Sequence, residues 1–253
     1  MIEKHIELEE HGRVGFKSHA QMVLWNVSDY YKVKSYYERC QRLSKEVQFW
    51  SAKARNEYLS GGDKDILKQL QSNADYYSNE LNKLIDELES KTYNYKYSDK
   101  KNGFELGNRK VEPRKIAIIE NTLVNPALVI YAKQISNTAI EEFRYIASGT
   151  GSLPTTPNQN KLQSENSRLD IFINGGFRNP HGDVIREGVI FPPGLDDALV
   201  TEFGSFTMPT ADEGDMQWRN VIDNVAEQID HDQGNTFYSI AHVTILQINY
   251  IND

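Results

Sequence analysis

The stretch that decides the fold is residues 28–91, SDYYKVKSYYERCQRLSKEVQFWSAKARNEYLSGGDKDILKQLQSNADYYSNELNKLIDELESK. Apolar residues recur in it at alternating spacings of three and four, the a/d pattern of amphipathic helices that pack as in a coiled coil. The first run carries this seam at Val33, Tyr36, Cys40, Leu43, Val47, Trp50 and Ala54. The second run carries it at Leu67, Leu70, Ala74, Tyr77, Leu81, Leu84 and Leu88. Charged residues occupy the outer faces of both runs, as on a solvated surface.

Gly61 and Gly62 separate the two runs. The distance from Ala54 to Leu67 is thirteen residues, one short of two heptads, so the seam loses its register at the glycines. Glycine tolerates the left-handed conformation that ends a helix, and the side chain of Asp63 can cap the next one. We therefore predict an antiparallel helical hairpin over residues 28–91, with a single bent helix in a parallel bundle as the alternative.

The C-terminal half has a different periodicity. From Glu142 onward, short apolar runs alternate with clusters of Gly, Pro, Asn and Asp, which is typical of an antiparallel β-sandwich or barrel. The predicted fold class is α+β, with a β-sandwich domain over residues 116–253. A helix is expected within it from Ala127 to about Ile135, after Pro126. Strands are expected near Phe143–Ser148, Leu169–Ile173, Val184–Phe191, Leu199–Phe206, Gln217–Ile222 and Thr236–Ile248.

Two shorter segments flank the hairpin. Residues 1–27 are predicted to be a docking segment, with a short strand around Val14 and Phe16 and then a brief helix or strand over Gln21–Trp25. Residues 92–115 are predicted to be a connector, in which tyrosines at period two place their rings on one face of a strand. Such a strand would pack against the helices or a partner, or would form a sugar-binding strip. The three tyrosines are Tyr93, Tyr95 and Tyr97.

The composition narrows the classes of function. The 253-residue chain has a formal net charge of −8, which argues against a nucleic-acid surface because phosphate binding needs clustered Lys and Arg. We expect no membrane span and no signal peptide. The single cysteine, Cys40, lies on the helical seam and is interpreted as a small buried apolar group, which suits a protein made in a reducing cytoplasm.

The β region contains a series of short motifs in a recognisable order and spacing. They are the turn 149–151 (Gly-Thr-Gly), the Pro/Thr-rich loop 153–157, Leu162 with Glu165 and Arg168, the segment 200–206 (Val-Thr-Glu-Phe-Gly-Ser-Phe), and residues 216–221. In these motifs the β region resembles the C-terminal domain of tail-fibre and baseplate-associated proteins of tailed phages. The resemblance covers roughly Asn121 to Ile248. The loops 174–176 and 180–182 depart from the pattern, and nothing before Lys115 matches it.

This resemblance implies a non-enzymatic virion structural protein that acts as a tail, baseplate or neck adaptor or as a fibre module. Its partners would be other virion tail proteins, and a host-surface glycan is a further candidate partner. The protein would be a homo-oligomer, with a trimer as one option, and it would assemble in the host cytoplasm. Two alternatives stay open, a carbohydrate-binding receptor module and a polysaccharide depolymerase.

No motif in the sequence points to catalysis, a cofactor or a metal. A depolymerase would need an acid and a base, for which the candidate carboxylates are Asp196, Asp197, Glu202 and those from Asp212 to Asp215. Asp196 and Asp197, however, follow the turn 192–194, and adjacent strand residues point to opposite faces. The six histidines are dispersed, and the loop Asp230–Asn235 lacks the bidentate Glu of a calcium site. The residues expected to make interactions are therefore Val33, Tyr36, Leu43, Val47, Trp50, Leu67, Leu70, Leu81, Leu84, Leu88, Tyr93, Tyr95, Tyr97 and Trp218.

Overall fold

The computed structural model describes residues 4–8, 12–99, 102–120, 122–123, 143–156, 158–181, 184–195, 197–211 and 213–250. The chain contains a long helical region of two helices and several antiparallel sheets, which confirms the predicted α+β class. The helix predicted from Ala127 to Ile135 lies outside the described residues.

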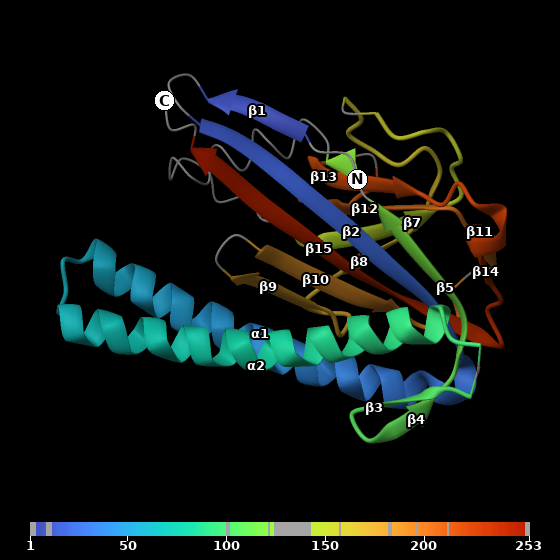
Figure 1. Cartoon of the computed structure of the whole chain (residues 1–253), viewed down its shortest axis with the longest axis horizontal. Helices are drawn as coiled ribbons and strands as arrows, with labels where there is room; N and C mark the ends of the chain where they lie inside the picture. Colours follow the sequence, from blue (N-terminus) through green and yellow to red (C-terminus); the bar gives the residue numbers. More distant parts are fainter. Residues whose placement is uncertain are drawn as a thin grey trace.

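The two helices form the predicted hairpin. Helix α1 (Tyr30–Leu59) and helix α2 (Lys64–Lys96) lie side by side and run in opposite directions (Figure 1). The turn contains Gly61 at a φ of 69°, a left-handed conformation that favours glycine. The Asp63 carboxylate caps α2, because its Oδ1 accepts hydrogen bonds from the backbone N–H groups two and three residues later, at 2.7 and 3.2 Å. The coiled-coil character of the pair stays a prediction.

A six-stranded sheet packs against the hairpin. Its strands follow the order β1-β2-β15-β10-β9, and β5 also pairs with β2. The strands are β1 (Lys4–Leu8), β2 (Gly12–Asn26), β5 (Pro113–Glu120), β9 (Phe177–His181), β10 (Val184–Phe191) and β15 (Thr236–Tyr250).

The first and last long strands of the chain pair along their whole lengths. Strands β2 and β15 each have 15 residues, and the ladder runs from the pair Asn26–Thr236 to the pair Gly12–Tyr250. This corrects the prediction of a short strand followed by a separate brief helix or strand in the N-terminal segment. The long ladder pairs the backbone N–H and C=O groups of both strands. This stabilisation outweighs the local sequence pattern, which predicted that the strand near Gly15 would be short.

A second sheet has five strands in the order β6-β13-β12-β7-β8. These are β6 (Thr122–Leu123), β7 (Tyr145–Gly149), β8 (Glu165–Asp170), β12 (Glu202–Phe206) and β13 (Met216–Val221). Two small sheets and two 3-10 helices complete the described fold. They are β3 (Phe104–Leu106) with β4 (Arg109–Val111), β11 (Ala198–Val200) with β14 (Ile229–His231), η1 (Val27–Asp29) and η2 (Val225–Glu227).

Two of the predicted strands differ from the structure by more than two residues or by a break. The strand expected at Leu169–Ile173 ends at Asp170, because the Asp170 carboxylate accepts from the N–H groups of Phe172 and Ile173 at 2.8 and 3.2 Å and so forms a turn. The strand expected over Leu199–Phe206 is divided between β11 and β12.

The tyrosines of the connector are helical, which corrects the prediction of a strand there. Helix α2 continues to Lys96, and its C-cap is Tyr97. The rings therefore do not share one face: Tyr93 and Tyr97 are exposed neighbours with centroids 4.8 Å apart, whereas Tyr95 packs against the core. The apolar face of α2 extends past Leu88 to Tyr95, and this tertiary packing outweighs the strand preference of tyrosine.

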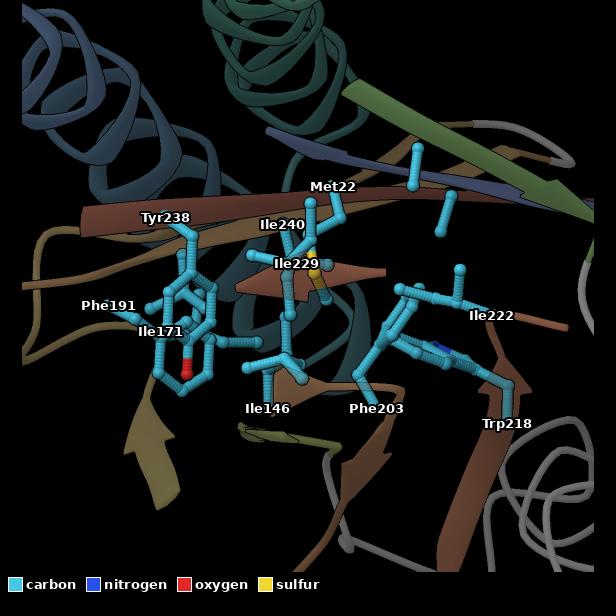
Figure 2. Packing of buried hydrophobic residues seen from close by; sticks show 14 of the residues in the cluster. Met22, Ile146, Ile171, Phe191, Phe203, Trp218, Ile222, Ile229, Tyr238 and Ile240 are labelled. Carbon is cyan, nitrogen blue, oxygen red and sulfur yellow. The ribbon is translucent and has the colours of Figure 1, made fainter. Parts of the chain in front are cut away.

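The six-stranded sheet contributes to two cores. On one side, Val23, Trp25 and Phe237 pack with seam residues of both helices. On the other side, the alternate residues of the same strands, such as Met22, Tyr238 and Ile240, pack with Ile146, Phe203 and Trp218 of the five-stranded sheet (Figure 2). The apolar residues on both faces of β15 are thereby explained, because this strand lies inside the sheet and is covered on both faces.

Candidate protein-interaction surface

The hairpin is longer than the part of it that covers the sheet. The N-terminal part of α1 and the C-terminal part of α2 pack on the six-stranded sheet, and their seam residues are buried in the core that they share with it. These buried seam residues include Val33, Tyr36, Cys40, Leu81, Leu84 and Leu88. The half that carries the turn extends beyond β9 and β10 (Figure 1). We call residues 49–76 the hairpin tip. The predicted interaction residues Trp50, Leu67 and Leu70 lie in the tip and are only half-buried, and Val47, which is buried, lies just before it.

Large apolar side chains are exposed over the hairpin tip. Their exposed fractions range from 50% to 71%, and the residues are Phe49, Tyr58, Leu59, Ile66 and Tyr76. None of them is an a/d position, so the seam pattern did not predict them. The available signal was the occurrence of large apolar residues outside the seam close to the turn. Such a concentration of exposed apolar residues is typical of a protein-interaction surface.

Aromatic and cationic groups of the tip are already arranged against one another. The rings of Phe49 and Trp50 meet edge to face with centroids 5.1 Å apart. The ammonium group of Lys53 lies 4.3 Å from the Phe49 centroid and 5.1 Å from the Trp50 centroid. Cation–π contacts of this kind restrict the motion of exposed rings in the free protein. Less side-chain conformational entropy is then lost when a partner binds.

A groove of about 340 Å³ runs between the two helices of the tip. The small side chains of Ser51, Ala54 and Ala74 line it, together with Tyr58, whose side chain is 71% exposed. The remaining lining residues are Arg55, Leu67, Gln71 and Asp75.

A second concave surface, of about 430 Å³, lies beside the C-terminal end of α2. Its cations already hold partners. Lys96 Nζ lies 2.9 Å from a carboxylate oxygen of Glu227, Lys115 Nζ donates to the Gln228 carbonyl at 2.7 Å, and Arg114 Nε donates to Asn26 at 2.5 Å. These contacts tie the helix and the strands together, so the surface is a structural junction.

The carboxylate of Glu202, which the depolymerase alternative would need, is fully engaged. Glu202 and Arg219 are both 0% exposed, with Arg219 Nε and Nη2 at 2.8 and 2.6 Å from Glu202 Oε2. Three backbone N–H groups also donate to this carboxylate, from Gly151 at 3.0 Å, Gln163 at 3.0 Å and Ser164 at 2.7 Å. The ion pair therefore fixes the loop between β7 and β8 on the sheet.

Gly151 is needed for this arrangement. An added Cβ would lie 2.3 Å from Glu202 Oε1 and 2.6 Å from Gln163 Cβ. We expect Gly151→Ala to lower the free energy of unfolding by roughly 1–3 kcal/mol, as overpacking does in a close-packed site. Gly234→Ala is the matched control, since its Cβ would meet nothing closer than 3.8 Å, and we expect a change within about 0.5 kcal/mol. Urea denaturation of the two variants would measure the difference, and equal effects would contradict the role given to Gly151.

A second buried polar cluster lies between the two larger sheets. Glu187 Oε1 accepts from Trp218 Nε1 at 2.8 Å and lies 3.2 Å from His242 Nδ1, and the His242 ring stacks on Trp218 with centroids 4.1 Å apart. Burial lowers the pKa of His242 more than the nearby carboxylate raises it. Burial opposes ionisation of Glu187, but the contact with His242, the nearby Arg178 and the Trp218 N–H outweigh it, so the pKa of Glu187 is lowered. Trp218 is fully buried here and is not available to a partner, contrary to its prediction as an interaction residue.

The remaining candidates for chemistry have structural roles. Cys40 is buried, and burial raises the pKa of its thiol to about 12, which disfavours the reactive thiolate. Asp232 accepts from the Gly234 N–H at 3.0 Å and from the Asn235 amide at 2.7 Å, as in an ordinary turn. Asp197 accepts from the Gln233 N–H at 2.6 Å, whereas Asp196 lies outside the described residues.

The described part of the chain offers no cluster for a metal and no membrane-spanning helix. No group of three or more His, Cys, Asp and Glu residues there is placed to hold a metal ion. Neither of the long helices, nor any other described helix, has the length and apolarity needed to cross a membrane. Comparisons with known protein families, with curated proteins and with solved structures find no match to this chain.

Proposed function

We propose that this chain is a structural component of a tailed-phage virion, which joins other virion tail proteins through the outer side of its hairpin tip. The observation that carries the proposal is the projecting tip with its exposed apolar side chains. The resemblance of the β region to tail-fibre and baseplate-associated proteins supports the choice of partner class. On this proposal the chain is not an enzyme, and it is located in the tail of the particle after assembly in the host cytoplasm.

The β region would hold the tip in place. We propose that the two larger sheets form a sandwich, which is supported by the core cluster to which both contribute. The two buried polar clusters support the same role, because their carboxylates are used to fix strands and loops. A rigid β module with a rigid helical projection is suited to setting the distance between two neighbours in an assembly.

The outer side of the tip is the side opposite to the groove. Phe49 lies two positions from the groove residue Ser51, and Tyr76 lies two positions from Ala74, which is about 200° around each helix and so away from the groove. Phe49 and Tyr76 are exposed there, 50% and 61% respectively. Aromatic residues in such positions bring a large contact area at low cost in conformational entropy. They are therefore the residues whose loss should weaken binding most.

The test is the presence and copy number of the chain in purified particles, measured by quantitative mass spectrometry. We expect the wild type in virions at a fixed copy number, and the double variant Phe49→Ser/Tyr76→Ser at about one tenth of that level, since losing two interface aromatics costs at least a factor of ten in affinity. Tyr31→Ser is the control, because Tyr31 is 78% exposed but lies at the opposite end of α1. Absence of the wild-type chain from virions would overturn the proposal, and binding of a host-surface glycan by such an absent chain would favour the receptor-module alternative.

A further inference from the structure

The groove at the hairpin tip lies on the same side of the two helices as the residues that pack against strand β9. In α1, Ser44 is buried against the edge strand β9: its hydroxyl donates to the Arg178 carbonyl at 2.6 Å and accepts from the Arg178 N–H at 3.1 Å. The groove residues Ser51, Arg55 and Tyr58 follow Ser44 by seven, eleven and fourteen positions, which places them on the same side of the helix. The side of α1 that packs on β9 near Ser44 is therefore not covered by β9 at the tip.

Helix α2 repeats this relationship. Ser78 is buried where its hydroxyl meets the Asn179 amide oxygen of β9 at 3.0 Å. Ala74, Gln71 and Leu67 precede Ser78 by four, seven and eleven positions and line the groove. Both helices thus extend past β9 with the faces that pack on it still uncovered (Figure 1).

The groove carries both a concave part and a convex part. The small side chains of Ser51, Ala54 and Ala74 help to line a hollow of about 340 Å³, and Tyr58, which also lines it, is 71% exposed. An aromatic side chain that enters such a hollow buries roughly 150–250 Å² of its surface, which is a large apolar contact for one residue. A surface that offers both the ring and the hollow can pair with itself about a two-fold axis.

The charges of the tip also suit a second copy. The whole chain has a net charge of −8, but residues 49–76 contain four cations and four anions, so two tips can approach without net repulsion. Three of the anions and two of the cations lie on the α2 side of the turn, whereas α1 carries two cations and one anion. Arg55 lies on the α1 wall of the groove and Asp75 on the α2 wall. A two-fold axis that sets α1 of one copy against α2 of the other brings these opposite charges together twice.

We propose that the groove between the helices of the hairpin tip is the site at which two copies of this chain associate. Tyr58 of each copy enters the groove of the other, and Arg55 of each copy pairs with Asp75 of the other. This contact uses the side of the tip opposite to Phe49 and Tyr76, and it does not rest on the proposed virion function.

Exchange of the two charges tests the proposal, because both side chains are exposed and their substitution is expected to leave the fold intact. By sedimentation velocity we expect the wild type to be a dimer. Arg55→Asp sets two acidic pairs across the contact and Asp75→Arg sets two basic pairs, so each variant alone is expected to dissociate at concentrations where the wild type is dimeric. An equimolar mixture of the two variants is expected to form a heterodimer. One of its two contacts then joins the substituted positions with their charges reversed, and the other keeps the native pair of Arg55 and Asp75.

Two further variants locate the contact on the groove. We expect Tyr58→Ala to raise the dimer dissociation constant about tenfold or more, since it removes the ring that fills the hollow. Tyr76→Ala, on the opposite side of the same tip, is the matched control and should leave the dissociation constant unchanged. A monomeric wild type, single charge variants that remain dimeric, or a mixture that stays monomeric would overturn the proposal. Circular dichroism melts of each variant would show that the hairpin remains folded. Absence from virions would leave this result untouched, so the two proposals fail separately.

Discussion

Glu202→Gln is expected to lower the free energy of unfolding by roughly 3–5 kcal/mol, the cost of removing one member of a buried ion pair. Arg219 would keep its charge at 0% exposure with no compensating carboxylate. The new amide would also turn an N–H₂ group toward donors that now share the carboxylate, among them the backbone N–H groups of Gly151 and Ser164. Equilibrium urea denaturation would measure the loss, and one below about 1 kcal/mol would show that the pair is dispensable.

A surface ion pair provides the control. Lys34 and Glu38 lie on an exposed part of α1, 3.9 Å apart, so Glu38→Gln should change the free energy of unfolding by less than about 0.5 kcal/mol. Replacing both buried partners, as in Glu202→Leu/Arg219→Leu, should not restore stability. A buried ion pair can often be replaced by apolar residues without loss of stability. Here, however, the backbone N–H groups of Gly151, Gln163 and Ser164 donate to the Glu202 carboxylate, and the double substitution would remove that acceptor.

The helical hairpin was predictable because its signals are local. The a/d seam, the glycines and the cap at Asp63 lie within one stretch of chain, and each of them acts through neighbours a few residues away. The error at Tyr93 and Tyr95 has the same origin. Period-two tyrosines are a local signal for a strand, but the apolar face of α2 continues through them and its packing against the sheet decides the outcome.

The sheet was less predictable because its main ladder is not local. Strand β15 could be identified as central from its two apolar faces, but its neighbour β2 lies more than 200 residues earlier in the sequence. No pattern in either segment specifies the other. The role of Glu202 was hidden for the same reason. It depends on Arg219, which lies on the neighbouring strand β13 two residues from Val221, the ladder partner of Glu202, and on the loop between β7 and β8 that contacts both side chains.

Much of the helical seam, from which most of the interaction candidates were drawn, is internal in the finished fold. The seam identifies where the two helices meet, and near the strands the sheet covers it as well. What exposes a surface at the tip is the difference in length between the hairpin and the sheet that it covers. That difference depends on where β9 and β10 end relative to the turn, which the helical sequence does not contain.

The stability of the protein is expected to depend on three histidines below pH 7. Burial lowers the pKa values of His19, His231 and His242 from the ordinary value of 6.5. As the pH falls through 6.5, the unfolded chain binds protons at these sites while the folded chain does not, so acid favours unfolding. Each fully excluded histidine would contribute a loss of about 1 kcal/mol between pH 6.5 and 5.5.

A half-buried glutamate acts in the opposite direction. Burial raises the pKa of Glu89 to about 7, so the folded chain binds a proton there before the unfolded chain does, and acid stabilises it. The net pH dependence of the wild type is therefore a difference between two effects. Comparison of variants separates them, because each variant removes one known contribution to the proton balance.

We expect His242→Gln to be less stable than the wild type at pH 7.5, since it loses the stacking on Trp218, and to lose less stability than the wild type on going to pH 5.5, by about 1 kcal/mol. Glu89→Gln should show the reverse, a steeper loss over the same range. Urea denaturation at the two pH values measures both slopes. If the His242→Gln slope equals that of the wild type, His242 takes up its proton in the folded state as readily as in the unfolded chain. The contact with Glu187 must then be a charged pair, because only a carboxylate held ionised beside the ring could offset the burial of an imidazolium at this position.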